Sequence, residues 1–254
     1  MEDTQEEKMP LTSHLEELRK RLIRSLIAVA ITFPIAYYFK EWLFKIITRP
    51  LMKALPENSH MIYTGLPEAF FNYLKISFFA GLILAAPYIL FQVWRFISPG
   101  LYKSERKYVG PFVVLSTLLF TGGVLFCYFL VLPPAFKFFI EFSTDFLKPM
   151  VSLKEYLSLA LKLLLAFGIV FEIPVFIFFL SRVGVVNARM LASKRKYAIL
   201  IIFVVAAILT PTPDAFTQLL MAGPMIILYE IGILVSRWAG KARSKSKSES
   251  DVSE

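Results

Sequence analysis

Residues 168–181 read GIVFEIPVFIFFLS, an apolar run that contains one carboxylic acid, Glu172, and one proline, Pro174. A charged carboxylate at the centre of a bilayer costs roughly 2.5–3.5 kcal/mol on insertion scales, so this acid should face a cavity or hold a proton. Pro174 lacks the backbone donor that would bond to Val170, four residues earlier, and it therefore predicts a kink. A kinked helix with an acid on its inner side predicts a polar pocket at membrane depth.

The composition around this run is that of a membrane protein. The chain has 254 residues, of which 57% are hydrophobic and 19% charged, and its mean hydropathy is +0.62. An ordinary soluble domain is about 45–50% apolar and about 25% charged. Cys127 is the single cysteine, and the two histidines, His14 and His60, lie far apart in the sequence. The sequence therefore predicts no disulfide framework, no metal site and no cofactor, and it contains no P-loop motif.

Charge-poor windows predict an all-α, polytopic membrane domain over residues 22–236. A helix needs about 20 mostly apolar residues to cross a bilayer, and long continuous apolar runs are a poor match to transmembrane strands. The six expected spans are approximately 22–40, 72–97, 108–134, 155–181, 196–210 and 215–236. The last two are short and are separated by the turn T-P-T-P-D, so this hairpin should thin the bilayer or lie behind neighbouring helices.

Lysine and arginine residues predict the orientation of the spans. Six spans place both termini on one side, where 19 of the flanking basic residues lie, against 7 on the other side. The positive-inside rule therefore predicts that both termini are cytoplasmic. We interpret the basic residues as orientation signals and expect no nucleic-acid binding.

Two segments outside the membrane domain are expected in the cytoplasm. The tail, 237–254, is polar and is expected to be disordered. Residues 1–21 should form an amphipathic helix that lies on the membrane surface, or packs on other cytoplasmic elements, before it enters the first span. Its leucines recur at helical spacing at Leu11, Leu15, Leu18 and Leu22. Ser13 and Glu16 have the spacing of a capping box at the start of this helix.

Two acids on the predicted cytoplasmic side, Glu17 and Glu105, lie among basic residues. The local interpretation gives Glu17 an ion pair with Arg21 one helical turn later, worth roughly 0.2–0.5 kcal/mol, and gives Glu105 a role in charge balance. The functional interpretation is that both acids receive a cationic guest. A carboxylate can meet the planar fork of an arginine bidentately, so two acids could meet two arginines, whereas lysine would serve poorly.

Four segments of the chain resemble the TatC family, a membrane subunit of twin-arginine translocases. They are SHLEELRKRL at 13–22, APYILFQVWRFISPGLYKSERK at 86–107, FGIVFEIPV at 167–175 and LTPTPDAFTQLLMAGPMIILYEIGIL at 209–234. Together they run in order over nearly the whole chain. One departure is that this chain has T-P-T-P-D where the family commonly has T-P-P-D.

The resemblance implies a receptor and scaffold that exports folded proteins across the bacterial cytoplasmic (inner) membrane. It implies six helices around a concave face, recognition of signal peptides that carry two consecutive arginines, and the proton-motive force as energy source. The expected partners are these signal peptides, TatA, TatB, the lipid bilayer and further copies of the chain in the translocase complex. We expect no enzymatic activity, because the sequence offers no nucleophile–base pair.

The resemblance also assigns individual residues. Glu17 and Glu105 match acids of the arginine-binding surface, and Glu172 matches the glutamate of the fourth span. Other signal-peptide-binding candidates from the same signatures are Arg19, Phe96 and Lys103. The candidates for partner-helix contact are Thr210 and Gln218, for which packing within the chain is the alternative. The residues assigned to structural motifs are Pro50, Pro87, Pro99 and Asp214.

Glu172 leaves alternatives open. We expect it to keep water at the concave face, to thin the local membrane and to contact signal peptide or partner helices. It could instead be neutralised by a neighbouring helix or by Lys162, although ten residues span about 15 Å along a helix. Glu230 is a second candidate for a buried acid. The competing function is a proton-coupled small-solute transporter with Glu172 as the proton carrier, and a third is a purely structural membrane protein that tolerates changes at Glu17, Glu105 and Glu172.

Overall fold

The computed structural model describes residues 11–56, 61–97, 109–142, 150–210 and 214–252, with side chains described between His14 and Ala239. Within these ranges the chain is helical apart from short connections and one isolated β-bridge, between Ile62 and Ser152. The all-α prediction is confirmed. The elements are α1 (Leu11–Tyr38), α2 (Lys40–Ala54), α3 (Glu68–Ile97), α4 (Val109–Phe126), the π-helical turn η3 (Cys127–Val131), α5 (Leu132–Ile140), α6 (Leu153–Val170), α7 (Ile173–Val183), α8 (Ala188–Ser193), α9 (Arg195–Leu209) and α10 (Ala215–Val252).

Five segments of the described chain are long and apolar enough to cross a membrane. They are His14–Tyr38, Glu68–Ile97, Gly110–Ile140, Leu153–Val183 and Ala215–Ala239. Helix α9 occupies the position of the expected fifth span, but its 15 residues extend only about 22 Å at 1.5 Å per residue. That length falls short of a hydrocarbon core of about 30 Å, as expected for the short final hairpin.

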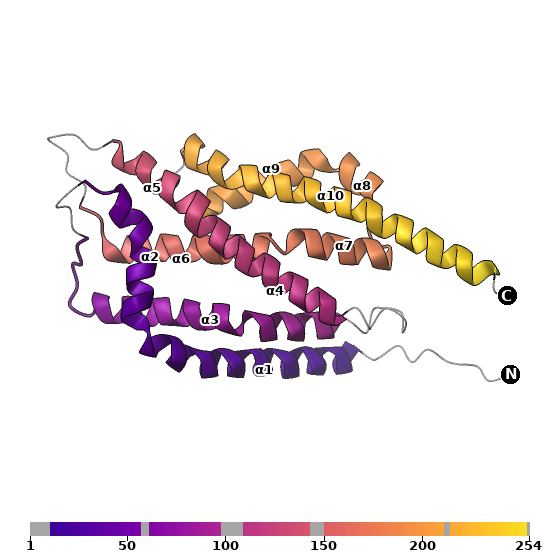
Figure 1. Cartoon of the computed structure of the whole chain (residues 1–254), viewed down its shortest axis with the longest axis horizontal. Helices are drawn as coiled ribbons and strands as arrows, with labels where there is room; N and C mark the ends of the chain where they lie inside the picture. Colours follow the sequence, from indigo (N-terminus) through magenta and orange to yellow (C-terminus); the bar gives the residue numbers. More distant parts are fainter. Residues whose placement is uncertain (1–10, 57–60, 98–108, 143–149, 211–213, 253–254) are drawn as a thin grey trace.

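The long helices run side by side, and α2 lies across one end of them (Figure 1). The start of α1 and the end of α10 lie at the opposite end of the molecule from α2. Helix α1 packs along α3, where the Thr32 hydroxyl donates to the Gly81 carbonyl at 2.7 Å. Because a Cβ on Gly81 would lie 3.0 Å from the Phe33 Cα atom, glycine is what permits this close approach.

Helix α6 contributes a large share of the main hydrophobic core. Its buried side chains meet those of α2, α3, α4, α5, α9 and α10, and Phe167 and Leu157 are fully buried. Gly123 of α4 packs directly against α6, because a Cβ at this position would lie 2.5 Å from the Phe167 carbonyl oxygen. A second, smaller cluster joins Trp94 of α3 to Val175 and Phe179 of α7.

The helix that carries the FEIP sequence is broken, as Pro174 predicts. Helix α6 ends at Val170 and α7 begins at Ile173, with Glu172 as the residue that precedes α7. The Glu172 backbone N–H bonds to the Ile169 carbonyl at 3.0 Å, and helical bonding resumes where the Phe176 N–H reaches the Glu172 carbonyl. In the sequence, Glu172 therefore lies between α6, which belongs to the main hydrophobic cluster, and α7, which belongs to the smaller one.

Both ends of the described chain are helical. Helix α1 begins at Leu11 and continues without a break through Tyr38. Ser13 therefore lies inside the helix, and the predicted capping box is wrong, because the residue that precedes the helix would have to cap it. The backbone of α10 continues to Val252, into the tail for which the sequence predicts disorder. The division of the chain into an N-terminal helix (1–21), a membrane domain (22–236) and a tail (237–254) stays a prediction.

Candidate functional site

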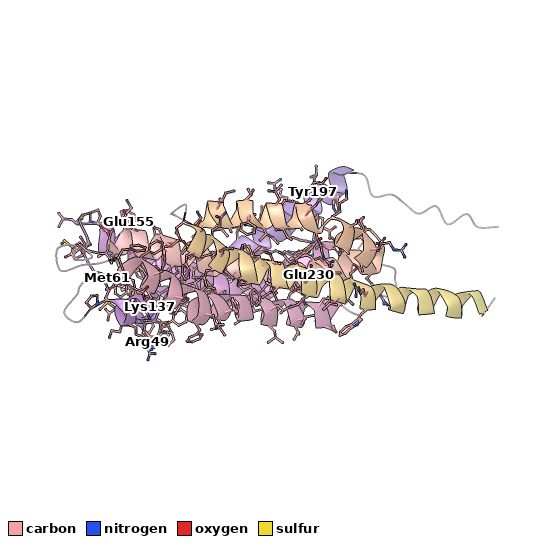
Figure 2. The ribbon with its side chains drawn as sticks, turned by 90° about the horizontal axis from the view of Figure 1, so that it is seen from above. Arg49, Met61, Lys137, Glu155, Tyr197 and Glu230 are labelled. Carbon is pink, nitrogen blue, oxygen red and sulfur yellow. The ribbon has the colours of Figure 1, made fainter. Side chains whose placement is uncertain are left out.

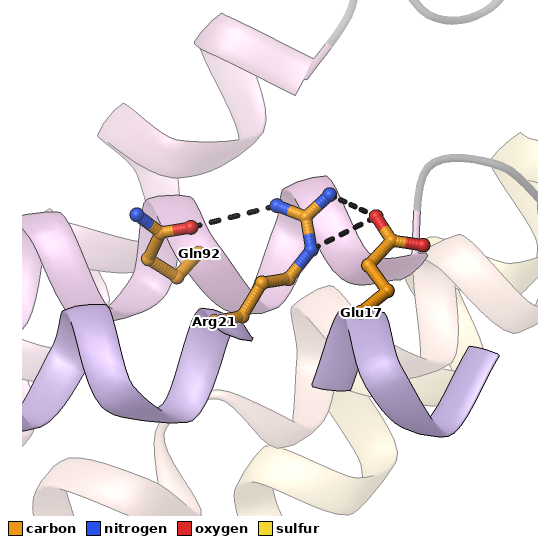
Figure 3. Close-up of polar contacts among 3 residues, drawn as sticks. All are labelled: Glu17, Arg21 and Gln92. Atoms are coloured by element: carbon orange, nitrogen blue, oxygen red, sulfur yellow. Dashed lines mark hydrogen bonds and ion pairs between the residues drawn. The ribbon is translucent and has the colours of Figure 1, made fainter. Parts of the chain in front are cut away.

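The candidate recognition site lies where α1 packs beside α3, near the end of the molecule that holds the start of α1 (Figure 1). The Arg21 Nε atom donates to Glu17 Oε1 at 3.0 Å, and Nη2 contacts the same oxygen. On its other side, Arg21 Nη1 donates to Gln92 Oε1 of α3 at 3.4 Å (Figure 3). The predicted ion pair between Glu17 and Arg21 is confirmed, and Gln92 is a partner that sequence reasoning missed.

The two oxygens of the Glu17 carboxylate differ in their contacts. Both bonds from Arg21 reach Oε1, and among the described residues Oε2 receives no hydrogen bond. Figure 3 shows Oε2 directed away from Arg21. The Glu17 side chain is 27% exposed and that of Arg21 only 12%, so the carboxylate is the more accessible member of the pair. Glu17 is therefore held in place with one acceptor oxygen available.

Aromatic and charged side chains surround Glu17. The His14 ring stacks on the Phe96 ring, with centroids 4.5 Å apart, and so joins the start of α1 to the end of α3. Glu16 pairs with Lys20 at 2.8 Å on the exposed side of α1, where Arg19 is also exposed. The structure thus brings Phe96 and Glu17 to neighbouring helices at one end of the molecule. Pro99, Lys103 and Glu105 lie outside the described residues.

Glu172 forms a second polar point, inside the membrane-spanning part of the chain. The residue is 3% exposed, and neither carboxyl oxygen has a hydrogen-bond partner among the described residues. The Ser116 hydroxyl of α4 lies near enough to interact with it electrostatically. Ser116 Oγ in turn accepts a hydrogen bond from Trp94 Nε1 at 2.8 Å. The bonded pair of Trp94 and Ser116 therefore lies close to a buried acid that makes no hydrogen bond among the described residues.

Lys162 does not neutralise Glu172. Its Nζ atom donates to the Ile208 carbonyl of α9 at 3.0 Å, and its side chain is exposed. Glu230, the second candidate for a buried acid, has an ionic partner. Arg195 donates to both of its carboxylate oxygens, at 2.7 and 2.8 Å. The Glu230 side chain is 43% exposed, so the prediction that it is a buried acid is wrong. Glu172 is the acid in the described part of the chain whose carboxyl is both buried and unpaired.

The last hairpin satisfies its polar groups within the chain. Thr210 donates to the Ala206 carbonyl at 3.0 Å, and the Gln218 amide of α10 donates to the Phe203 carbonyl of α9 at 3.2 Å. Asp214 caps α10, because its Oδ1 accepts from the Thr217 N–H at 2.7 Å. These bonds match the alternative of packing within the chain, and partner contact at Thr210 and Gln218 stays a prediction.

Glu68 holds the opposite end of the molecule together. It is buried and accepts from the backbone N–H groups of Thr64 at 3.0 Å, Gly65 at 3.3 Å and Lys154 at 3.0 Å. The adjacent bridge between Ile62 and Ser152 adds two backbone bonds. Sequence reasoning missed this residue. Its local signal is an acid at the first residue of a long helix. Its partners are less predictable, because Thr64 and Gly65 precede α3 and Lys154 lies in the first turn of α6, where N–H groups lack helical partners.

Two of the prolines assigned to structural motifs, Pro50 and Pro87, lie inside helices. Pro50 is buried within α2, and Pro87 is exposed within α3, which continues through it without a break. Among the described residues, no group of three or more His, Cys, Asp or Glu side chains could hold a metal ion. The acids of most interest in the described chain are Glu17 with its ion pair, the buried Glu172 and the backbone-bonded Glu68.

Comparison with known proteins decides the family. The family model described as "Sec-independent protein translocase protein (TatC)" matches residues 13–224. The chain belongs to the TatC family. It is 52% identical over 245 residues to the TatC protein of Desulforapulum autotrophicum, covering 96% of this chain and 90% of that one. It is 44% identical to TatC of Escherichia coli K12, covering 97% of this chain and 94% of that one.

Solved structures agree with this assignment. A crystal structure of the twin-arginine translocase receptor TatC superposes with a TM-score of 0.80 at 45% identity, over 89% of this chain and 99% of that one. A second TatC structure, in the detergent DDM, gives a TM-score of 0.81. The chain therefore has the six-helix TatC fold and is a multi-pass membrane component of a Sec-independent protein translocase, not an enzyme. Nothing in these comparisons supports the alternative of a proton-coupled solute transporter.

Proposed function

We propose that this chain is the signal-peptide receptor of the twin-arginine translocation system in the bacterial inner membrane. It binds the consecutive arginines of an incoming signal peptide at the end of the bundle that holds Glu17, and this end faces the cytoplasm. It then assembles with TatA, TatB and further copies of itself to export the folded cargo. The proton-motive force supplies the energy.

The observation that carries the proposal is the half-occupied carboxylate of Glu17. Arg21 holds Oε1 and is itself held by Gln92, while Oε2 has no hydrogen-bond partner among the described residues. A guest guanidinium can therefore bind Oε2 without first breaking the internal pair. Charge-assisted hydrogen bonds of this kind contribute about 1.5–3 kcal/mol. Glu105 supplies the second carboxylate, for the second arginine.

The basic surroundings favour arginine over lysine. Arg19 and Lys20 on α1 repel any cation that approaches, so net charge does not attract the guest. Recognition then depends on geometry. A guanidinium presents its N–H donors in a fixed plane and can bring one of them to Oε2 in a defined orientation, whereas an ammonium acts as a point charge. Phe96, stacked on His14 one helical turn before Glu17, offers an apolar surface at the same end of the molecule.

Glu172 acts after docking. A buried carboxyl without a partner attracts water or a polar guest, because an unsatisfied polar group in an apolar environment is costly. It therefore contacts the inserted signal peptide or a partner helix at membrane depth. Thr210 and Gln218 lie in the short final hairpin, where partner helices dock against the chain.

A binding measurement with paired variants tests the proposal. Glu17→Gln should weaken binding of a labelled signal peptide with two arginines by roughly tenfold or more, since a charge-assisted bond is lost. The matched control is Glu16→Gln, which removes the same charge from the neighbouring position on the exposed side of α1. It should leave the affinity within about twofold of the parent, because Glu16 is already paired with Lys20.

The peptide itself supplies the second control. A version with two lysines should bind the parent chain more weakly than the version with two arginines, and this difference should shrink in Glu17→Gln. If the two Glu variants weaken binding equally, or if the parent does not distinguish arginine from lysine, the receptor site is not at Glu17.

A further inference from the structure

Helix α2 has the character of a helix that lies in the membrane interface. Figure 1 shows it crossing the end of the bundle, steeply inclined to α1 and α3. Its 15 residues are too few to span a bilayer. The inner face is buried through Ile47, Thr48, Pro50 and Leu51. The exposed residues of α2 include one acid at its start, Glu41, and further along mainly aromatic, basic and apolar residues: Trp42, Lys45, Arg49, Met52 and Lys53.

A pocket of about 440 Å³ opens between this helix and the turn η3. The side chains that line it are Ile46, Arg49, Pro50, Lys53, Tyr128, Phe129 and Pro133. The Tyr128 hydroxyl donates to the Ile46 carbonyl at 2.7 Å and so fixes the wall between α2 and η3. Two cations line this pocket and no acid does. Its electrostatics therefore favour an anion.

The surroundings of the pocket favour an anion that carries acyl chains. Phe129 is 64% exposed and Leu130 is 56% exposed on the adjoining face of the span Gly110–Ile140, which in a membrane faces lipid. Arg49 points outward at the same end of the molecule as Lys137 (Figure 2). The pocket thus combines a cationic rim at the level of the headgroups with an apolar wall that continues into the bilayer.

A larger pocket at the same end of the molecule lacks this charge pattern. It measures about 580 Å³ and is lined mainly by apolar side chains, together with Glu155 and Lys162. These two side chains have opposite charges, and Lys162 is already bonded to the Ile208 carbonyl. The volume of a pocket therefore does not by itself indicate which pocket could bind an anion. The distinguishing feature of the pocket beside α2 is its pair of cations.

We infer that the pocket beside α2 binds the phosphate headgroup of an anionic glycerophospholipid, with Arg49 and Lys53 on the phosphate and the acyl chains along Phe129 and Leu130. The arginine fork matches phosphate oxygens, and the lysine ammonium adds a point charge. A zwitterionic lipid would bring an ammonium group for which the pocket lining offers no carboxylate. Phosphatidylglycerol should therefore bind in preference to phosphatidylcholine. The proposal does not depend on signal-peptide recognition, which involves the other end of the molecule.

Native mass spectrometry of the purified full chain in detergent tests this site. Titration with dioleoyl phosphatidylglycerol should show a saturable adduct, and dioleoyl phosphatidylcholine should not. The double variant Arg49→Gln/Lys53→Gln should weaken phosphatidylglycerol binding by roughly tenfold or more, since each basic residue near an anionic lipid contributes about fivefold. The matched control Lys45→Gln/Lys137→Gln removes two charges from the same end of the molecule but leaves the pocket lining intact.

Several outcomes would overturn the assignment. Unchanged lipid binding in the Arg49/Lys53 double variant would remove the pocket from consideration. An equal loss in both double variants would mean diffuse surface charge, and displacement of the lipid by millimolar inorganic phosphate would mean a site for the free ion. Thermal unfolding in phosphatidylcholine alone checks folding, and Arg49→Lys, which keeps the charge but loses the fork, should show intermediate affinity if the fork contributes.

Discussion

At the scale of single residues, the most informative side chains are acids that the fold treats differently. Glu68 is satisfied by three backbone donors, and Glu17 is half-occupied by Arg21. Glu172 is buried with no hydrogen-bond partner among the described residues. A buried polar group without a partner lowers stability, which makes Glu172 a candidate for a functional role. The three acids thus range from a fully bonded anchor to a buried carboxyl without a bond.

Replacing Glu172 should separate stability from export. Glu172→Leu should raise the free energy of unfolding by about 1–3 kcal/mol, because it removes an unsatisfied buried polar group. Export of a twin-arginine reporter by cells that carry this variant should fall. The measurements are thermal unfolding in detergent and the amount of reporter exported.

The matched variant for this test is Lys162→Met. It removes another ionisable residue of the span Leu153–Val183, one that is exposed and that, among the described residues, bonds only to the Ile208 carbonyl. Its export should stay near the parent level. A Glu172→Leu variant that exports normally would leave this acid without a place in the mechanism.

Gln92 shows how a buried amide can position a charge. Its Oε1 accepts from Arg21 Nη1, and the residue is 3% exposed. Gln92→Leu should lower the free energy of unfolding by about 1–3 kcal/mol, because a partly buried guanidinium N–H loses its partner. Signal-peptide affinity should fall as well, since Arg21 would hold Glu17 less firmly. Thermal unfolding and peptide titration measure the two effects, and a variant that changes neither would contradict the positioning role.

At the scale of elements, the contact of α4 with α6 depends on one glycine of an adjacent pair. A Cβ on Gly123 would lie 2.5 Å from the Phe167 carbonyl oxygen, whereas one on Gly122 would meet nothing within 4 Å. Gly123→Ala should therefore lower the free energy of unfolding by about 1–3 kcal/mol through overpacking. Gly122→Ala should be neutral or slightly stabilising, because alanine favours the helix. Equal unfolding temperatures for the two variants would show that the helices can move apart without cost.

Elements and local pairs were predictable because their causes are local in the sequence. Charge-poor windows indicated an all-α membrane domain, Pro174 marked the break before α7, and one helical turn joined Glu17 to Arg21. The TatC resemblance came from four ordered motifs. Contacts that cross between helices were not predictable in this way. Gln92 meets Arg21 across 71 positions and Glu68 meets Lys154 across 86, so only the packed structure brings them together.

At the scale of the whole molecule, the two ends of the helix bundle hold different candidate sites. One end holds the start of α1, the end of α10 and the Glu17 site, and the other holds α2 with its cationic pocket (Figure 1). Between them, Glu172 lies at the break from α6 to α7. The proposed signal-peptide site, the buried acid and the proposed lipid site are therefore distributed along the long axis of the bundle.

The Glu17–Arg21 ion pair beside Gln92 also affects how strongly charge alone can attract a guest cation to this site. Glu17 is already bonded to a guanidinium of the same chain, that of Arg21, before any guest binds. A guest cation meets a carboxylate whose charge is already partly balanced by Arg21 and whose Oε1 oxygen is already bonded, so charge alone attracts it weakly. On the proposed function, selectivity would therefore come from how the guest places its donors on the remaining oxygen, and not from strong net attraction.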